Sequence, residues 1–352
     1  MASQRPRVWV SQPLFDDLVE QLAEHFDVDP VAEVTAHTPQ QVARALAEAD
    51  GALVTLNERI GPAELARAPH LRAIANVGVG YNNLDIAALD AAGIIATNTP
   101  DVLTETTADL GFALLMAAAR RIGESERWLR AGQWRQWSFS TMLGADVHGS
   151  TLGILGMGRI GQAIARRGHH GFGMRVLYHN RSRLAEPVER GVGASYVDLD
   201  TLLAQADHLV LVLPYSPASH HLIDAAALAK MKPTATLVNI ARGGIVDELA
   251  LARALVSGRL GAAGLDVYED EPAVRAELLA LDNVVLTPHI GSASLATRRA
   301  MVQLAIDNLV AALGHGPRAG RPPNPVTATR TTAIATGITT IAGQDKVAAG
   351  KR

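Results

Sequence analysis

The 352-residue sequence contains no cysteine. Disulfide frameworks, thiolate metal ligands and thiolate nucleophiles are therefore excluded, and this usage fits a reducing compartment. The sequence also lacks an apolar stretch of the roughly 20 residues that span a bilayer. Residues 1–10 show neither an apolar signal core nor a small-residue cleavage pattern. We therefore expect a soluble cytoplasmic protein with no membrane partner and no metal site.

An excess of positive charge is missing as well. The 32 Lys and Arg residues stand against 35 Asp and Glu residues, which gives a net charge of -3. Because no broad basic field can hold a phosphate backbone, nucleic acid is not an expected partner. In contrast, 48% of the residues are apolar and only 19% are charged. A chain of this length and composition can bury a core in each of two domains.

Short apolar runs of strand length alternate with longer helical patterns along nearly the whole chain. This alternation predicts parallel sheets with helices on both faces, an α/β fold. Strands are expected at residues 7–11, 51–56, 71–77, 93–98, 151–156, 174–180, 208–213, 236–240, 261–267 and 283–287. The main helices are expected at residues 13–25, 84–92, 104–121, 162–167 and 294–313.

The organisation between these runs predicts two domains. The small-residue helix at 104–121 and the irregular, Trp-rich segment 128–147 indicate a crossing from one domain to the other. The helix at 294–313 follows the last strand, and it can return the chain to the first domain. We therefore expect one discontinuous domain of residues 1–100 plus 291–325, a second domain of residues 101–290, and a mobile tail of residues 326–352.

A glycine-rich turn stands between an expected strand and an expected helix. It reads Gly156-Met157-Gly158-Arg159-Ile160-Gly161. In this context Gly156 serves a tight turn, Gly158 allows close approach to a pyrophosphate, and Gly161 allows close helix packing. The unpaired N–H groups at the helix start then bind the anion. A glycine turn without a ligand is the alternative, but the strand–turn–helix context favours a dinucleotide site.

The end of the next strand distinguishes between the two nicotinamide dinucleotides. NAD-binding proteins usually place an Asp or Glu here to hold the ribose 2′-hydroxyl. This chain instead has Asn180, Arg181, Ser182 and Arg183, with no carboxylate. Two guanidinium groups can pair with a 2′-phosphate, so NADP(H) is the favoured cofactor, with NAD(H) possible. The alternative is that both arginines belong to a solvated loop.

Three groups that could carry chemistry follow three expected strand ends. Arg242 can fork onto a substrate carboxylate, although a structural salt bridge is the alternative. His289 can give a proton to the alkoxide that a hydride creates, and Glu271 can hold and orient the imidazolium. Taken singly, His289 would more often be a turn residue and Glu271 a surface charge. Together they predict a catalytic triad of Arg242, Glu271 and His289.

These residues lie in motifs that resemble the D-isomer-specific 2-hydroxyacid dehydrogenase family over about residues 1–325. The motifs are Asn76-Val77-Gly78-Val79-Gly80-Tyr81, the glycine turn, residues 239–244, residues 264–272 and residues 288–292. Residues 102–109 and 180–183 are most similar to the glyoxylate/hydroxypyruvate and 2-ketogluconate reductase branch. The resemblance implies a Rossmann cofactor domain inserted into a flavodoxin-like substrate domain, both doubly wound parallel sheets.

The resemblance also implies roles for further residues. Val77 and Gly78 would offer backbone N–H groups to the substrate carboxylate, and Ser292 would be another substrate contact. The residues implied to line the cofactor are Thr107, Arg159, Ile160, Pro214, Asp266 and Gly291. Asp266 is expected near the nicotinamide carboxamide, although a structural carboxylate at a strand end is the alternative.

The expected activity is the NADPH-preferring reduction of small 2-keto acids such as glyoxylate, hydroxypyruvate and 2-ketogluconate to D-2-hydroxy acids. Oxidation of 3-phosphoglycerate, D-lactate or phosphite on the same scaffold stays open, because the motifs are shared. A dinucleotide-sensing, corepressor-like binding protein is the rival from another class. The family implies a homodimer in which Trp128, Trp134 and Trp137 serve the interface, or alternatively belong to the ordinary core.

Overall fold

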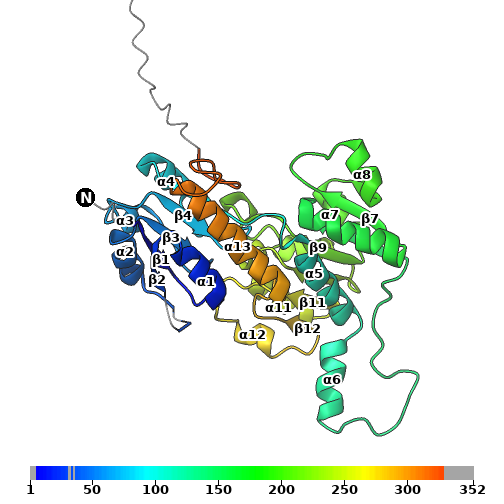
Figure 1. Cartoon of the computed structure of the whole chain (residues 1–352). Coiled ribbons are helices and arrows are strands. Elements are labelled where there is room, and N and C mark those ends of the chain that lie inside the picture. The colour runs from blue at the N-terminus through cyan, green and yellow to red at the C-terminus, as the bar shows by residue number, and fades with distance from the viewer. Residues whose placement is uncertain (1–4, 31–32, 35, 329–352) are drawn as a thin grey trace, which may run out of the picture.

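A computed structural model describes residues 5–30, 33–34 and 36–328, which form two parallel sheets covered by helices (Figure 1). The strands are β1 (Arg7–Val10), β2 (Asp27–Pro30), β3 (Gly51–Val54), β4 (Ala73–Asn76), β5 (Ile95–Thr97), β6 (Thr151–Leu155), β7 (Arg175–His179), β8 (Ala194–Tyr196), β9 (His208–Leu211), β10 (Thr236–Asn239), β11 (Ala262–Leu265) and β12 (Val284–Leu286). The α-helices are α1 (Asp16–Ala23), α2 (Pro39–Ala47), α3 (Pro62–Leu65), α4 (Ile86–Ala92), α5 (Thr104–Ala119), α6 (Ile122–Arg130), α7 (Arg159–Arg166), α8 (Glu186–Val192), α9 (Leu199–Gln205), α10 (Ala225–Lys230), α11 (Glu248–Val256), α12 (Ala276–Leu279) and α13 (Leu295–Ala312). Three shorter turns are η1 (Arg167–Gly171), η2 (Pro217–Ser219) and η3 (Gly243–Ile245).

The strand orders confirm the predicted fold class. The first sheet has the order β2-β1-β3-β4-β5, which is the flavodoxin-like order. The second has the order β12-β11-β10-β9-β6-β7-β8, which is a doubly wound Rossmann arrangement with its switch point between β6 and β9. In both sheets the central strands are buried along their whole length, as in β3, β4, β9 and β10, because helices cover both faces.

Two strands, β2 and β8, are not among those expected from the sequence. β2 has the sequence DVDP, and it lies at the outer edge of the first sheet with only Val28 partly buried. β8 is a three-residue edge strand of the second sheet. Edge strands need less apolar surface, and a proline is tolerated there. The apolar pattern that predicts the central strands is therefore absent from both.

Two long helices begin where the chain passes between the sheets. α5 packs against β10, β11 and α7 of the second sheet, whereas α13 packs against β3, β4 and α1 of the first. The hydroxyls of Thr106 and Thr297 lie 2.6 Å apart, so the first turns of the two helices are joined. The first sheet thus receives its covering helix α13 from the far end of the chain (Figure 1). The domain boundaries near residues 100 and 290 stay a prediction.

The start of the expected mobile tail is attached to the first sheet. Val326 N–H donates to Ala96 O at 2.8 Å, and Ala96 N–H donates to Thr327 Oγ1 at 2.9 Å. Residues 326–328 are therefore held beside β5, in contrast to the expectation. Residues 329–352 of that expected tail lie outside the described residues. None of the helices in the described ranges is long and apolar enough to cross a membrane.

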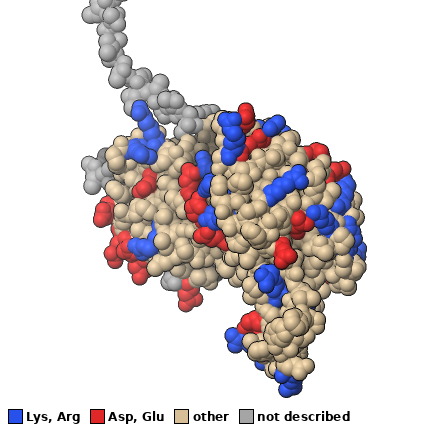
Figure 2. All heavy atoms as spheres, turned by 90° about the vertical axis from the view of Figure 1, so that its right-hand side faces the viewer, with Lys and Arg blue, Asp and Glu red and all other residues tan. Residues whose placement is uncertain are grey.

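A protruding arm, residues 122–143, consists of α6 and the irregular segment that follows it. In Figure 2 it forms a lobe whose surface is largely uncharged. Six apolar side chains of the arm are each at least half exposed: Ile122, Leu129, Trp134, Trp137, Phe139 and Leu143. Trp137 and Phe139 pack edge to face with ring centroids 4.5 Å apart. The alternative of ordinary core residues is therefore wrong for Trp134 and Trp137, whereas Trp128 is partly buried.

Candidate active site

The glycine turn joins β6 to α7 at the switch point of the second sheet. Gly156 has φ +103°, and a Cβ there would lie 2.8 Å from the backbone of Val212. A Cβ on Gly161 would lie 2.3 Å from Gly156 O. These two glycines are required by the turn itself. By contrast, a Cβ on Gly158 would meet nothing within 4 Å, so open space lies beside this backbone at the start of α7. The turn therefore fits a pyrophosphate.

The four residues expected at the adenosine end have different surroundings. Asn180 Oδ1 accepts from Met157 N–H at 2.7 Å, so Asn180 holds the glycine turn. Arg183 forks onto Glu189 at 2.9 and 2.8 Å. Arg181 and Ser182 are exposed, and Arg181 has no ion pair or hydrogen bond among the described residues. Arg181 is therefore the guanidinium of this stretch that is not engaged within the described part of the protein.

Glu189 explains why Arg183 is engaged. This carboxylate is 5% exposed and also accepts from the Tyr178 hydroxyl at 2.7 Å. Hydrogen bonds from Arg183 and Tyr178 lower the pKa of Glu189 to about 2, against a smaller opposing effect of burial. Tyr178 Oη in turn accepts from Leu184 N–H at 2.8 Å. The contacts among Tyr178, Arg183 and Glu189 fix the loop after β7. Arg183 therefore has a structural role in this loop.

Arg242 follows β10, and its side chain reaches the first domain. Asn239 fixes its backbone, since Asn239 Nδ2 donates to Arg242 O at 2.9 Å. Arg242 Nε donates to Asn82 Oδ1 at 2.8 Å, and Nη1 donates to Ala241 O at 2.7 Å. Burial lowers the pKa of Arg242, and the nearby Glu271 carboxylate opposes this shift. The guanidinium nevertheless stays charged at neutral pH. The alternative of a salt bridge is not observed among the described residues.

Glu271 and His289 form the expected pair. His289 Nδ1 lies 2.8 Å from Glu271 Oε2, and Glu271 Oε1 accepts from Tyr268 N–H at 3.0 Å. Burial alone raises the pKa of Glu271, but the hydrogen bonds from His289 and Tyr268 and the charge of Arg242 hold it below its ordinary value. Glu271 is therefore ionised at neutral pH. His289 Nε2 has no partner among the described residues and is free for proton transfer.

The loops that carry the triad are packed directly on one another. A Cβ on Gly243 would lie 1.8 Å from the backbone carbon of Tyr268, so the turn after Arg242 touches the loop that carries Glu271. In the same loop, Glu269 N–H donates to Glu248 Oε1 at 2.7 Å. The Glu269 carboxylate pairs with Arg275 at 2.7 Å and with His221. This charged cluster, which the sequence motifs do not indicate, holds the loop that carries Glu271.

Asp266 anchors the loop that carries His289. Its Oδ1 accepts from the Thr287 hydroxyl at 2.7 Å and from Ile290 N–H at 2.8 Å, and its Oδ2 accepts from Gly291 N–H at 2.8 Å. Burial raises the pKa of Asp266, although these hydrogen bonds oppose the shift. These contacts are those of a structural carboxylate at a strand end, and the expected place of Asp266 near the nicotinamide carboxamide stays a prediction. His289 itself has φ +52°, a strained value for a non-glycine residue, and Asp266 helps to hold it.

The loop after β4 differs from the expectation. Val77 N–H donates to Val54 O at 2.8 Å, and Gly78 N–H donates to Asn76 O at 2.9 Å. Both groups are committed within the protein, so the expected role of Val77 and Gly78 as donors to a carboxylate is not supported. The second Val-Gly pair, Val79-Gly80, has no such backbone bond among the described residues. A Cβ on Gly80 would lie 1.9 Å from Arg242 Nη2, so this pair lies beside the guanidinium.

The remaining expected site residues lie near the starts of α5, α7 and α13 and in the loop after β9. Arg159 pairs with Asp101 at 2.7 Å. Thr107 is buried, and a Cβ on Gly291 would contact it at 3.4 Å, which places α5 beside the His289 loop. Ile160 is partly buried, Pro214 is exposed after β9, and Ser292 is partly exposed before α13. None of these observations tests the individual roles, which stay predictions.

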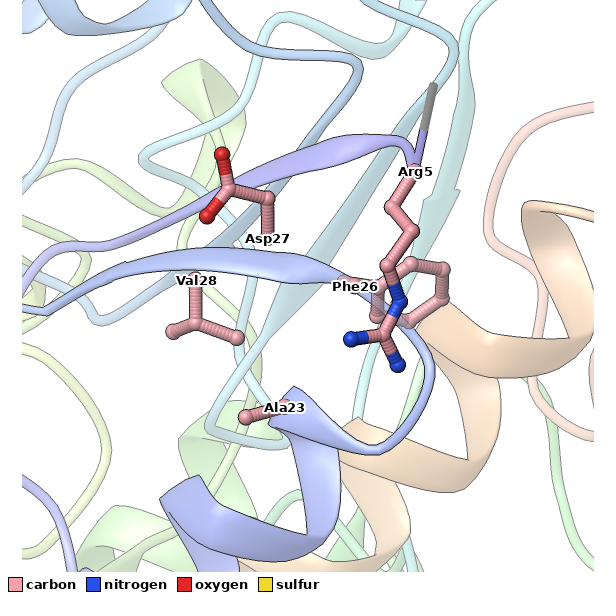
Figure 3. A pocket seen from close by; sticks show the side chains of 5 residues that line it. All are labelled: Arg5, Ala23, Phe26, Asp27 and Val28. Atoms are coloured by element: carbon pink, nitrogen blue, oxygen red, sulfur yellow. The ribbon is translucent and has the colours of Figure 1, made fainter. Parts of the chain in front are cut away.

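An open hollow elsewhere holds none of the expected site residues. It lies beside β2 and is lined by Arg5, Ala23, Phe26, Asp27 and Val28 (Figure 3). The Arg5 guanidinium in it donates to the carbonyl of Glu24. The hollow therefore lies at an outer edge of the first sheet, away from the carboxyl ends where parallel sheets place ligands.

A glycine turn at a Rossmann switch point and an ordered acid/base pair at neighbouring strand ends are the features of NAD(P)-dependent oxidoreductases. Residues 112–291 match the family model for the D-isomer specific 2-hydroxyacid dehydrogenase, NAD binding domain. The chain belongs to this family, as the sequence motifs predicted, and it is an NAD(P)-dependent oxidoreductase.

Several proteins are similar over almost the whole chain. A glyoxylate reductase of Thermococcus onnurineus is 44% identical over 311 residues, which cover 87% of this chain and 92% of that protein. A glyoxylate/hydroxypyruvate reductase B of Klebsiella pneumoniae is 47% identical over 310 residues, with 88% and 95% covered. An NADPH-dependent glyoxylate/hydroxypyruvate reductase of Sinorhizobium meliloti, solved with NADP and malonate, is 36% identical with a TM-score of 0.79, and 92% and 97% of the chains are covered.

Proposed function

We propose that this chain reduces glyoxylate and hydroxypyruvate to the corresponding 2-hydroxy acids, with NADPH as the preferred reductant and 2-ketogluconate as a further substrate. The observation that carries the proposal is the pair formed by His289 Nδ1 and Glu271 Oε2 at 2.8 Å, which leaves His289 Nε2 free, with Arg242 close enough to Glu271 for its charge to lower the pKa of that carboxylate. The similar proteins of Thermococcus and Klebsiella are named as reductases of these substrates, which supports the choice of keto acid.

Each group of the triad has one task. Arg242 and the N–H groups of Val79 and Gly80, rather than those of Val77 and Gly78, bind the substrate carboxylate, and Ser292 adds a contact. A bound reduced nicotinamide supplies the hydride to the keto carbon. His289 gives the proton on Nε2 to the carbonyl oxygen as negative charge develops there. Glu271 stabilises the imidazolium and keeps Nε2 directed at the substrate.

The preference for NADPH rests on the loop after β7. Arg181 is exposed and unpaired among the described residues, and no carboxylate stands beside it to repel a 2′-phosphate. Arg183 is held by Glu189, so we assign the phosphate contact to Arg181 and Ser182, with Arg183 shaping the loop. The Sinorhizobium relative was solved with NADP, which supports this assignment.

A turnover assay tests the proposal. Absorbance of NADPH is followed with glyoxylate, hydroxypyruvate and 2-ketogluconate, and the same series is run with NADH. The proposal expects fast oxidation of NADPH and a higher kcat/KM with NADPH than with NADH. Tight NADPH binding without turnover would instead support the dinucleotide-sensing alternative. Turnover only of 3-phosphoglycerate, D-lactate or phosphite would support another dehydrogenase of the family.

Exchange of the proton donor tests the mechanism. His289→Ala should lower kcat by about a hundredfold to ten-thousandfold, the usual range for a general acid, with the Kd for NADPH nearly unchanged. His315→Ala is a matched control, because His315 lies on the outside of the first sheet against His25 and Phe26. Wild-type turnover by His289→Ala would exclude the role assigned to this histidine.

We also propose that the arm joins two copies of the chain. Its exposed aromatic side chains, such as Trp137 and Phe139, form an apolar surface that is unusual for a monomer. A second copy can cover it around a two-fold axis. Light scattering should give a dimer for the wild type and a monomer for Trp137→Glu. A wild-type monomer at micromolar concentration would contradict this proposal.

A cytoplasmic location stays a prediction.

A further inference from the structure

We propose that Asn82 is a positioning residue that aligns the Arg242 guanidinium for the substrate carboxylate. This inference rests on the function proposed above, and it assigns a role to a residue outside the triad. Arg242 Nε donates to Asn82 Oδ1 at 2.8 Å across 160 positions of sequence. The two residues belong to different sheets, so this bond is made only when both parts of the molecule are in place.

Asn82 stands on a rigid loop. The neighbouring Asn83 is buried, and its Nδ2 donates to Thr55 O at 3.0 Å and to Glu58 O at 3.1 Å. Asn76, at the end of β4, donates through its own Nδ2 to Gly80 O at 3.0 Å. These two buried amides fix the path of the chain from β4 to Asn82. The acceptor that Asn82 offers to Arg242 is therefore held in one place.

The contacts of the Arg242 guanidinium occupy Nε and Nη1 and leave Nη2 for the substrate carboxylate. Asn82 accepts from Nε, Ala241 O accepts from Nη1 at 2.7 Å, and the backbone of Gly80 lies under Nη2, where a Cβ would come within 1.9 Å. Nη2 has no acceptor among the described residues. A planar guanidinium held at Nε and Nη1 cannot rotate, so its remaining N–H groups keep a fixed direction. This is the orientation that a forked carboxylate contact requires.

The chemistry of an amide suits this task. The Asn82 side chain is neutral, so it accepts from Nε without cancelling the positive charge of Arg242. The full charge stays available to the substrate carboxylate. Without an acceptor at Nε, the half-buried guanidinium would turn toward other oxygens. A misplacement of about 1 Å of a binding group can lower the rate by about a hundredfold.

A purely structural role for Asn82 predicts something different. The side chain is exposed, so its loss should change the stability of the fold little. If Asn82 only joined the two domains, its replacement would alter cofactor and substrate binding together. If it acts through Arg242, its replacement weakens the substrate carboxylate contact alone, and has no further effect once Arg242 is removed.

The experiment uses the full chain with four variants: Asn82→Ala, Asn82→Asp, Arg242→Ala and the double variant Asn82→Ala/Arg242→Ala. Asn283→Ala is the matched control, because its amide donates to Gly261 O at 3.2 Å beside β12, at the amino end of the sheet. Two quantities are measured: kcat and KM for glyoxylate with NADPH, and the affinity of the NADPH-bound protein for oxalate, an unreactive carboxylate probe. Thermal unfolding and the Kd for NADPH complete the set.

In Asn82→Ala we expect kcat/KM for glyoxylate and the affinity for oxalate to fall about tenfold to a hundredfold, with Tm and the Kd for NADPH unchanged. Asn82→Asp retains an acceptor oxygen for Nε, but its carboxylate cancels part of the charge of Arg242, so kcat/KM and oxalate affinity should fall by less than in Asn82→Ala without reaching the wild-type values. The double variant should equal Arg242→Ala. Wild-type values for Asn82→Ala, or an equal loss on removing Asn82 in the Arg242→Ala background, would overturn the inference. Failure of the proposed function has a different signature, since the wild type itself would then not consume NADPH with glyoxylate.

Discussion

Two glycines of the β6–α7 turn should respond in opposite ways to the same substitution. In Gly158→Ala the new Cβ meets no protein atom within 4 Å, so the cofactor-free fold should keep its Tm within about 2 °C. The methyl group would however stand in the space assigned to the pyrophosphate. Loss of one charge-assisted hydrogen bond is worth about 1.5–3 kcal/mol, which corresponds to a rise of about tenfold to a hundredfold in the Kd for NADPH.

Gly161→Ala should instead destabilise the fold. Its Cβ would lie 2.3 Å from Gly156 O, which is a backbone atom and cannot rotate away. Overpacking of this kind costs about 1–3 kcal/mol, and Tm should fall by several degrees. The measurements are thermal unfolding without cofactor and calorimetric titration with NADPH. Gly171→Ala serves as control, since its Cβ also meets nothing within 4 Å. An unchanged Kd in Gly158→Ala would contradict a pyrophosphate site beside this glycine, and an unchanged Tm in Gly161→Ala would contradict the close packing of the turn.

Four further substitutions have defined outcomes. Gly80→Ala should push Arg242 Nη2 away from a contact of 1.9 Å, so that kcat/KM falls about a hundredfold while Tm is kept, which steady-state kinetics and thermal unfolding can check. Arg181→Ser should raise KM for NADPH at least about tenfold and leave KM for NADH unchanged, whereas Arg183→Ser should also lower Tm. Glu189→Gln should be less stable than the wild type at neutral pH. Because folding lowers the pKa of Glu189 from 4.5 to about 2, urea midpoints of the two proteins should converge as the pH falls between these values.

The main features of the fold could be predicted because central parallel strands are apolar on both faces. The apolar runs that became β3, β9 and β10 have strand length and fit strands that are buried on both faces. β2 could not be predicted in this way, because Asp27, Asp29 and Pro30 give it a polar, exposed pattern. Its position depends on pairing with β1, which no local pattern shows.

The substrate loop shows a limit of a different kind. Val77-Gly78-Val79-Gly80 contains the same Val-Gly dipeptide twice. The sequence alone therefore does not decide which of the two pairs offers its N–H groups to the substrate carboxylate. Only hydrogen bonding distinguishes the two, because the strand ladder uses Val77 N–H and a tight turn uses Gly78 N–H. Arg183 is a similar case. Its partner Glu189 lies six residues further on a helix, and local sequence does not reveal that this carboxylate is buried.

The origin of α13 at the far end of the chain affects how the protein is made. Leu309 of this helix and Leu313 directly after it close over Gly51 of β3, where an added Cβ would meet Leu313 at 2.8 Å. A ribosome releases β3 roughly 250 residues before it releases these leucines. One face of the first sheet therefore waits uncovered while the inserted domain is translated and folds. The nascent amino-terminal segment is then the stage at which a chaperone would be needed most.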